Sequence, residues 1–129
     1  MNTDEYRLNL NSITERIIGC VYKVSNTLGS GFLEKVYENA LAIEIRKNGL
    51  EVKQQHGIRV LYDAEVVGEF AADLLVDDKV LIELKAAKGL DEVHMAQCLN
   101  YRKATDLSVC LLVNFGRAKA EIRRIVNNY

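Results

Sequence analysis

The chain has 129 residues, of which 49% are hydrophobic, so it is long enough for one domain with its own core and too short for two. Its 17 basic and 18 acidic residues nearly cancel, which excludes a global positive field that would attract nucleic acid or a membrane. Residues 1–10 are too polar for a signal peptide, and no apolar run has the length of a membrane span. We therefore expect a single domain over residues 1–129, in the cytoplasm and without a membrane partner.

Two helices are predicted in the first fifty residues. Ser12 and Glu15 have the spacing of a capping box, and apolar residues then recur at helical spacing as far as Leu28. The segment 29–31 contains two glycines and breaks the chain. A second helix is predicted over residues 32–47, ended by a left-handed cap at residues 48–49.

After residue 51 the pattern changes to period two, which predicts strands. We expect strands at 51–62, 66–76 and 80–86, with a turn at 63–65 and a loop at 77–79. A helix at 91–105 with Asp91 as its N-cap follows, then a buried strand at 107–115 and an edge strand at 121–126. The order α-α-β-β-β-α-β-β is typical of an α/β fold with helices against a mixed sheet.

The stretch from residue 68 to 86 reads GEFAADLLVDDKVLIELKA and places Asp73, Glu83 and Lys85 inside two apolar runs. Apolar residues on both faces of the second run predict a strand that is covered on both sides. Charges buried in such a strand cost several kcal/mol unless they find partners. The partner is either a divalent metal ion or, in the alternative interpretation, an ion pair at the edge of the sheet.

The register of this hairpin decides whether the two acids meet. A three-residue loop at 77–79 pairs Val76 with Val80 and puts Asp73 opposite Glu83 on one face. A two-residue loop would separate the acids onto opposite faces. The polar tripeptide favours the first register, in which a cation such as Mg²⁺ or Mn²⁺ would relieve the repulsion between the carboxylates.

These residues resemble a known nuclease family. Asp73, a nine-residue gap and then Glu83 and Lys85 are similar to the PD-(D/E)xK nuclease core, although Ala72 replaces the proline. Residues 31–37 match GxxExxY, the signature of a family of small proteins in that superfamily, and residues 97–101 match the QxxxY motif of RecB-like members. The resemblance spans residues 15–126. It implies a restriction-endonuclease-like core and metal-dependent hydrolysis of nucleic acid, with DNA favoured over RNA.

The resemblance also implies roles for single residues. Asp73 and Glu83 would bind Mg²⁺ or Mn²⁺, with the Leu84 carbonyl and Glu34 as further ligands. Lys85 would position or deprotonate the attacking water. Gln97 would hold the substrate backbone or Lys85. The implied catalytic set is Glu34, Asp73, Glu83, Lys85 and Gln97, and the implied substrate contacts are Tyr37 and Tyr101.

Two function classes remain open at this point. The first is a metal-dependent phosphodiesterase, and the second is a binding or assembly module that keeps the nuclease-like fold without turnover. The near-zero net charge favours the second, whereas the presence of all three core residues favours the first. The small number of cations also favours a homodimer or a targeting partner that extends the nucleic-acid surface.

The three cysteines are interpreted as reduced core thiols. Cys20, Cys98 and Cys110 are an odd number at wide spacing and include no CxxC pair. Such a pattern indicates neither a zinc site nor a disulfide framework.

Overall fold

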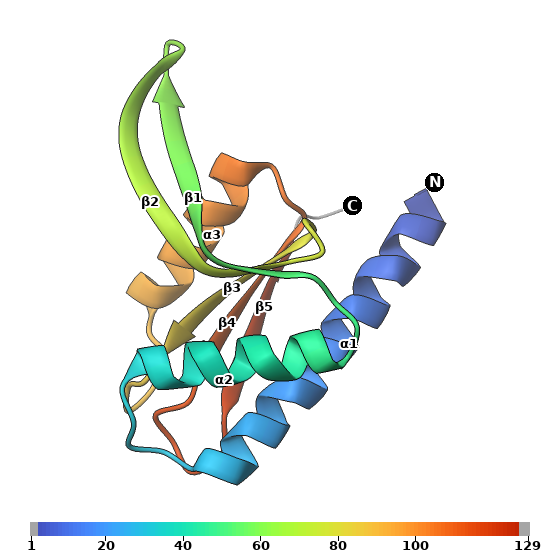
Figure 1. Cartoon of the computed structure of the whole chain (residues 1–129). Coiled ribbons are helices and arrows are strands. Elements are labelled where there is room, and N and C mark those ends of the chain that lie inside the picture. The colour runs from blue at the N-terminus through green and yellow to red at the C-terminus, as the bar shows by residue number, and fades with distance from the viewer. Residues whose placement is uncertain (1–2, 127–129) are drawn as a thin grey trace.

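The computed structural model describes residues 3–126 and contains one five-stranded sheet with helices on both of its faces (Figure 1). The helices are α1 Thr3–Leu28, α2 Glu34–Lys47 and α3 Glu92–Thr105. The strands are β1 Val52–Tyr62, β2 Glu65–Val76, β3 Val80–Lys85, β4 Val109–Asn114 and β5 Glu121–Val126. The predicted order of elements is confirmed. Within the described residues, no helix combines the length and the apolar character needed to cross a membrane.

The strands lie in the order β1-β2-β3-β4-β5, so each strand pairs with its neighbours in sequence. All pairs are antiparallel except β3 with β4, which are parallel. A parallel pair needs a long crossover connection, and α3 supplies it. The predicted mixed sheet is therefore correct, with α3 as its single crossover helix among the described elements.

The residues of β3 alternate between two cores, as predicted. Val80, Ile82 and Leu84 belong to the larger apolar cluster, which the sheet forms with α1 and α2. Leu81 belongs to a smaller cluster on the opposite face, together with Tyr101 of α3. Glu83 and Lys85 share the face of Leu81 because side chains alternate along a strand. The charged residues of β3 therefore lie on the α3 side of the sheet.

The loop between β2 and β3 has the predicted length of three residues. Val76 pairs with Val80, and Asp77 and Asp78 adopt left-handed φ angles of 50° and 53°. The Asp77 carboxylate accepts a hydrogen bond from the Glu51 N–H (2.8 Å), and the Asp77 N–H donates to the Glu51 carbonyl (2.9 Å). This reciprocal pair holds the loop in the register that brings the two acids to one face.

The outer part of the β1–β2 hairpin, residues 59–70, extends away from the rest of the molecule and is called the arm (Figure 1). Most of its side chains are exposed. Its turn has two residues, Asp63 and Ala64, both with left-handed φ angles, and Tyr62 pairs with Glu65. The predicted turn at 63–65 is therefore one residue too long.

Both N-terminal helices begin at other positions than predicted. Helix α1 already includes Thr3, so the apparent capping box at Ser12 lies inside the helix. The extra turns are held by tertiary packing, because Leu10 is buried in the core and the Tyr6 hydroxyl lies 3.4 Å from Ser108 Oγ. Helix α2 begins at Glu34, two residues later than predicted, because Leu33 has extended backbone angles.

The prediction that all three cysteines are reduced is wrong for two of them. Cys98 of α3 and Cys110 of β4 form a disulfide bond, with Cα atoms 6.1 Å apart, whereas Cys20 is a free, buried thiol. The packing of α3 against β4 brings the two residues together. Sequence spacing carries no information on which side chains meet across two elements, so the pairing was not visible from the pattern.

Candidate functional site

Asp73 and Glu83 meet across the β2–β3 hairpin. The Asp73 N–H donates to Glu83 Oε1 (3.0 Å), and the Leu84 N–H donates to Asp73 Oδ2 (2.7 Å). The strand pairing ends at Leu74 and Ile82, so these main-chain groups bond to the carboxylates instead of to the opposite strand. The carboxylate of each acid is thus held by a backbone N–H group at or next to the other acid.

Burial is the main reason why these acids do not ionise easily. Glu83 is only 4% exposed, and its burial, together with the negative charge of Asp73, raises its pKa to about 8. Burial also raises the pKa of the half-buried Asp73, although hydrogen bonds from the Leu84 N–H and Gln55 oppose the shift. A site of this kind favours the binding of a positive charge.

No basic side chain neutralises the two acids. Within residues 3–126, no ion pair shorter than 4 Å joins Asp73 or Glu83 to a lysine, arginine or histidine. Lys85 is partly exposed, and its positive charge lowers the pKa of both acids without a direct contact. The arrangement therefore does not support the alternative interpretation of a structural ion pair.

The oxygen donors of the site fit a hard divalent cation. Mg²⁺ is commonly bound by one or two carboxylates and completes its shell with water and substrate phosphates. Glu83 Oε2 accepts no hydrogen bond from the described residues and is available as a ligand. In the described part of the chain, no group of three His, Cys, Asp or Glu side chains is close enough to hold a metal. The site thus offers two carboxylates as ligands for such an ion.

Glu34 lies near this pair but is not a third member of it. Its side chain is exposed in the first turn of α2. Its negative charge contributes to the raised pKa of Glu83, so the two carboxylates are within electrostatic reach. Direct or water-mediated binding of a metal by Glu34 stays a prediction.

Tyr37 occupies the core and not a surface that substrate can reach. It is fully buried, and its ring stacks on Phe115 with 4.6 Å between centroids. Its hydroxyl donates to the Gly29 carbonyl (2.6 Å) and accepts from the Phe32 N–H (3.2 Å). This position argues against the predicted substrate contact. The tyrosine of the GxxExxY signature instead holds the turn that leads into α2 and Glu34.

Two residues that the sequence reasoning missed connect α2 to the acid pair. Gln55 Nε2 donates to Glu38 Oε1 (2.7 Å) and lies 3.2 Å from Asp73 Oδ1. Glu38 is buried and also accepts hydrogen bonds from Lys35 and Gln54. A chain of contacts thus runs from the second turn of α2 to the carboxylate of Asp73.

Gln55 reaches Asp73 because the strand is irregular at this position. It has a left-handed φ of 54°, and the β1–β2 pairing omits both Gln55 and Asp73, which lie opposite each other. The flanking pairs, Gln54 with Leu74 and His56 with Ala72, keep one register. The spacing of four residues between Glu34 and Glu38 could have indicated that both lie on one side of α2. Nothing in the sequence distinguishes Gln55 from other polar strand residues.

Asn114 is a further missed residue, and it holds the backbone that follows Lys85. It is fully buried, its Oδ1 accepts from the Ala87 N–H (2.9 Å) and the Gly116 N–H (2.9 Å), and its Nδ2 donates to the Ala87 carbonyl (3.0 Å). A Cβ on Gly116 would lie 2.1 Å from the Ala87 oxygen, so only glycine fits there. This contact fixes the chain two residues beyond Lys85.

Gln97 and Tyr101 form a second group on α3. Gln97 Nε2 donates to the Tyr101 hydroxyl (3.1 Å), and within the described residues it makes no hydrogen bond to Lys85. Burial raises the pKa of Tyr101, and the charges of Glu83 and Asp73 raise it further, so its hydroxyl is within electrostatic reach of the acids. On the same helix, Asp91 and His94 form a capping box at the N-terminus, which confirms the prediction of Asp91 as the N-cap.

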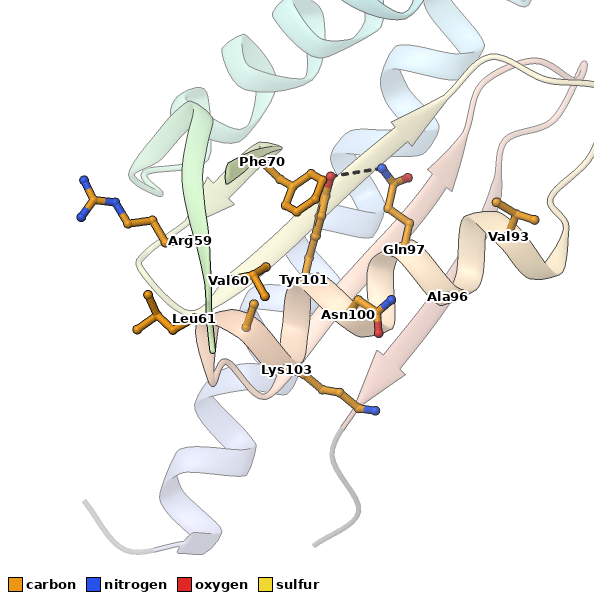
Figure 2. A pocket seen from close by; sticks show the side chains of 11 residues that line it. Arg59, Val60, Leu61, Phe70, Val93, Ala96, Gln97, Asn100, Tyr101 and Lys103 are labelled. Atoms are coloured by element: carbon orange, nitrogen blue, oxygen red, sulfur yellow. Dashed lines mark hydrogen bonds between the residues drawn. The ribbon is translucent and has the colours of Figure 1, made fainter. Parts of the chain in front are cut away.

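A cavity of about 850 Å³ lies between the arm and α3 (Figure 2). Gln97 and Tyr101 belong to its wall, opposite residues of β1 and β2. Figure 2 shows the Phe70 ring beside the Tyr101 ring, with 5.7 Å between their centroids. The lining residues are Arg59, Val60, Leu61, Phe70, Val93, Ala96, Gln97, Asn100, Tyr101, Lys103 and Ala104.

The match to a family model agrees with the motifs. The model of a family described as the PD-(D/E)XK nuclease superfamily matches residues 11–125. Among solved structures, the chain is similar to an alkaline exonuclease (LHK-Exo) from Laribacter hongkongensis, with 14% sequence identity and a TM-score of 0.49. That match covers 84% of this chain and 76% of the exonuclease chain. No curated protein sequence matches the chain significantly.

Proposed function

We propose a nuclease function from the premise that the chain belongs to the PD-(D/E)XK nuclease superfamily. The proposed activity is metal-dependent hydrolysis of phosphodiester bonds in nucleic acid, with DNA as the first substrate to test. The observation that carries the proposal is the pair Asp73 and Glu83, a half-buried and a buried carboxylate that meet without a basic partner among the described residues. The signature at residues 31–37 places the chain, within this proposal, in the GxxExxY group.

In the proposed mechanism, Asp73 and Glu83 would hold Mg²⁺ or Mn²⁺, with the Leu84 carbonyl and Glu34 as further ligands, Glu34 directly or through water. When bound, such an ion would supply Lewis acidity at the scissile phosphate and would lower the pKa of the attacking water. Lys85 positions or deprotonates the attacking water and stabilises negative charge on the phosphate. Gln97 and Tyr101 act on the substrate from α3.

The surrounding residues fit a preorganised site. The backbone N–H groups of Asp73 and Leu84 orient the two carboxylates, and Gln55 adds a third donor. Asn114 holds the segment that follows Lys85. Functional groups need such support to stay in a productive geometry.

A catalytically silent binding or assembly module is the second candidate, favoured by the net charge of −1. A module freed from catalysis has no need of two converging acids that lack a basic partner among the described residues. Calorimetric titration with Mg²⁺, followed by a nicking assay on plasmid DNA, separates the two candidates. We expect the parent to bind Mg²⁺ and nick DNA and Glu83→Ala to do neither. Metal binding without cleavage of DNA or RNA would favour the module, and absence of metal binding would overturn the proposal.

A further inference from the structure

We infer that the cavity between the arm and α3, called the arm groove below, binds unpaired nucleotides. The inference rests on the proposed function and deepens it, because it assigns the substrate class: nucleic acid with a single-stranded segment, such as an end, a flap or a gap. The groove is bounded by the arm on one side and by α3 on the other (Figure 2).

The walls of the groove offer aromatic and apolar surface that is open to solvent. Phe70 is 50% exposed and its ring is tilted by 41° to the ring of Tyr101. Val93, on α3, is 75% exposed. Unpaired bases present π-faces that stack on aromatic side chains, whereas the bases of a duplex already stack on each other. A groove of this composition therefore distinguishes single strands from duplex.

A cation at the rim complements the phosphates of a strand. Lys103 lines the groove from α3, is exposed, and its ammonium group points outward from the apolar wall (Figure 2). Arg59 also lines the groove, but its guanidinium lies on the side of β1 that faces away from α3, 3.9 Å from Glu69 (Figure 2). Lys103 is therefore the groove residue that we expect to meet a phosphate. The near-zero net charge of the chain makes such local cations important for binding.

The polar side chains in the groove suit base edges, and the groove adjoins the candidate active site. Gln97 and Asn100 supply amide groups that donate and accept hydrogen bonds. Tyr101 lines the groove and packs in one cluster with Ala72, which precedes Asp73, and with Leu81, which shares the face of Glu83 on β3. A strand that stacks on Phe70 and Tyr101 would therefore have its backbone beside the two acids. A purely apolar protein segment would need neither the rim cation nor this continuity.

The test measures binding apart from cleavage, in the Glu83→Gln background with Mg²⁺ present. Fluorescence anisotropy compares a labelled oligothymidylate of about 15 nucleotides, near the upper limit of known single-strand site sizes, with a blunt duplex of equal length. We expect preference for the single strand. Phe70→Ala should weaken its binding by about 5- to 150-fold, the range of one lost stacking contact. Phe70→Leu keeps apolar bulk but loses the π-face, and it should also weaken binding.

Two controls locate the effect. Val67→Ala changes an exposed apolar residue of the same arm that does not line the groove, and it should leave binding unchanged. Lys103→Ala should lower the slope of log affinity against log salt by about 0.7, the value for one phosphate contact to a single strand. This variant tests the inference even if the Phe70 variants fold poorly, which thermal unfolding would reveal.

Three results would overturn the inference: equal binding of the blunt duplex, unchanged binding by Phe70→Ala, or a dimer in light scattering that Phe70→Ala dissociates. The last would show that the groove accepts a second copy of the chain. The nicking assay on the parent stands apart from these measurements. If the protein binds single strands through Phe70 but does not cleave nucleic acid, the proposed function is wrong and the inference on the arm groove stands. If it cleaves nucleic acid but its binding does not depend on Phe70, the proposed function stands and the inference on the arm groove is wrong.

Discussion

The two faces of the sheet differ in what they bury. The face toward α1 and α2 is a large apolar cluster, to which β3 contributes Val80, Ile82 and Leu84. The face toward α3 has a smaller cluster and carries Glu83 and Lys85 from the same strand. Ile82 and Glu83 are neighbours in sequence and are both nearly inaccessible to solvent, yet one stabilises the fold and the other costs stability. The comparison indicates that the larger core offsets the cost of a site on the opposite face.

The largest expected effect is on the face toward α1 and α2. Ile82→Ala should reduce the free energy of unfolding by about 2–5 kcal/mol, because it leaves a cavity in a fully buried position. Glu83→Gln, one residue away, should leave the metal-free protein at pH 8 at least as stable as the parent, because it removes a charge that repels Asp73. Urea unfolding measures both. A larger loss from Glu83→Gln than from Ile82→Ala would contradict the division between the two faces.

Lys85→Ala should act on the rate and not on the fold. We expect cleavage to fall by about 10²-fold or more, the usual scale for a lost acid-base or electrostatic contributor. The free energy of unfolding and the Mg²⁺ affinity should stay near those of the parent, since Lys85 is partly exposed. Single-turnover cleavage, urea unfolding and calorimetry test the three parts. Unfolding of the variant would show that Lys85 is a structural residue.

The metal-free protein should lose stability as the pH rises. The folded state raises the pKa of Glu83 from 4.5 to about 8, so between these values it binds more protons than the unfolded chain. The stabilisation is complete below pH 4.5 and is lost as the pH rises through 8, with a slope of at most about 1.4 kcal/mol per pH unit from this group. Thermal or urea unfolding in EDTA at several pH values measures the slope, and Glu83→Gln should flatten it.

Magnesium should reverse this loss at the upper end of the range, because the ion binds the ionised pair and displaces the proton. Mass action adds about 2.7 kcal/mol of stability at a hundredfold excess over Kd. A metal-free stability that rises between pH 5 and pH 8 in the parent but not in Glu83→Gln would contradict the assignment of Glu83.

The smallest expected effects separate Glu34 from Glu38, two of the glutamates of α2. Glu34→Gln should be at least as stable as the parent without metal, bind Mg²⁺ more weakly and lose activity, because Glu34 is exposed and lies within electrostatic reach of Glu83. Glu38→Gln is the matched control, since Glu38 is buried and accepts hydrogen bonds from Lys35, Gln54 and Gln55. It should lower the stability more than Glu34→Gln does.

Calorimetry and thermal unfolding of both variants give the comparison. An unchanged Mg²⁺ affinity in Glu34→Gln, with a slight loss of stability, would remove Glu34 from the site and leave it as a favourable charge at a helix N-terminus.

The sequence alone determined the order of the elements, the two-sided cover of β3 and the register that joins Asp73 to Glu83. These features follow from local rules: side chains alternate along a strand, and the length of a polar loop sets the pairing. Both could be applied to residues 68–86 without knowing the rest of the fold. The predicted start of α1 was wrong because packing of the residues before Ser12 outweighed the capping pattern at Ser12.

Only the tertiary structure decided which side chains meet across separate elements. It paired Cys98 with Cys110, buried Tyr37 against Phe115 and turned Gln55 toward Asp73. It also created the groove between the arm and α3. The physical reason is that each of these contacts depends on how two or more elements pack, whereas periodicity reports only which face of its own element a residue occupies.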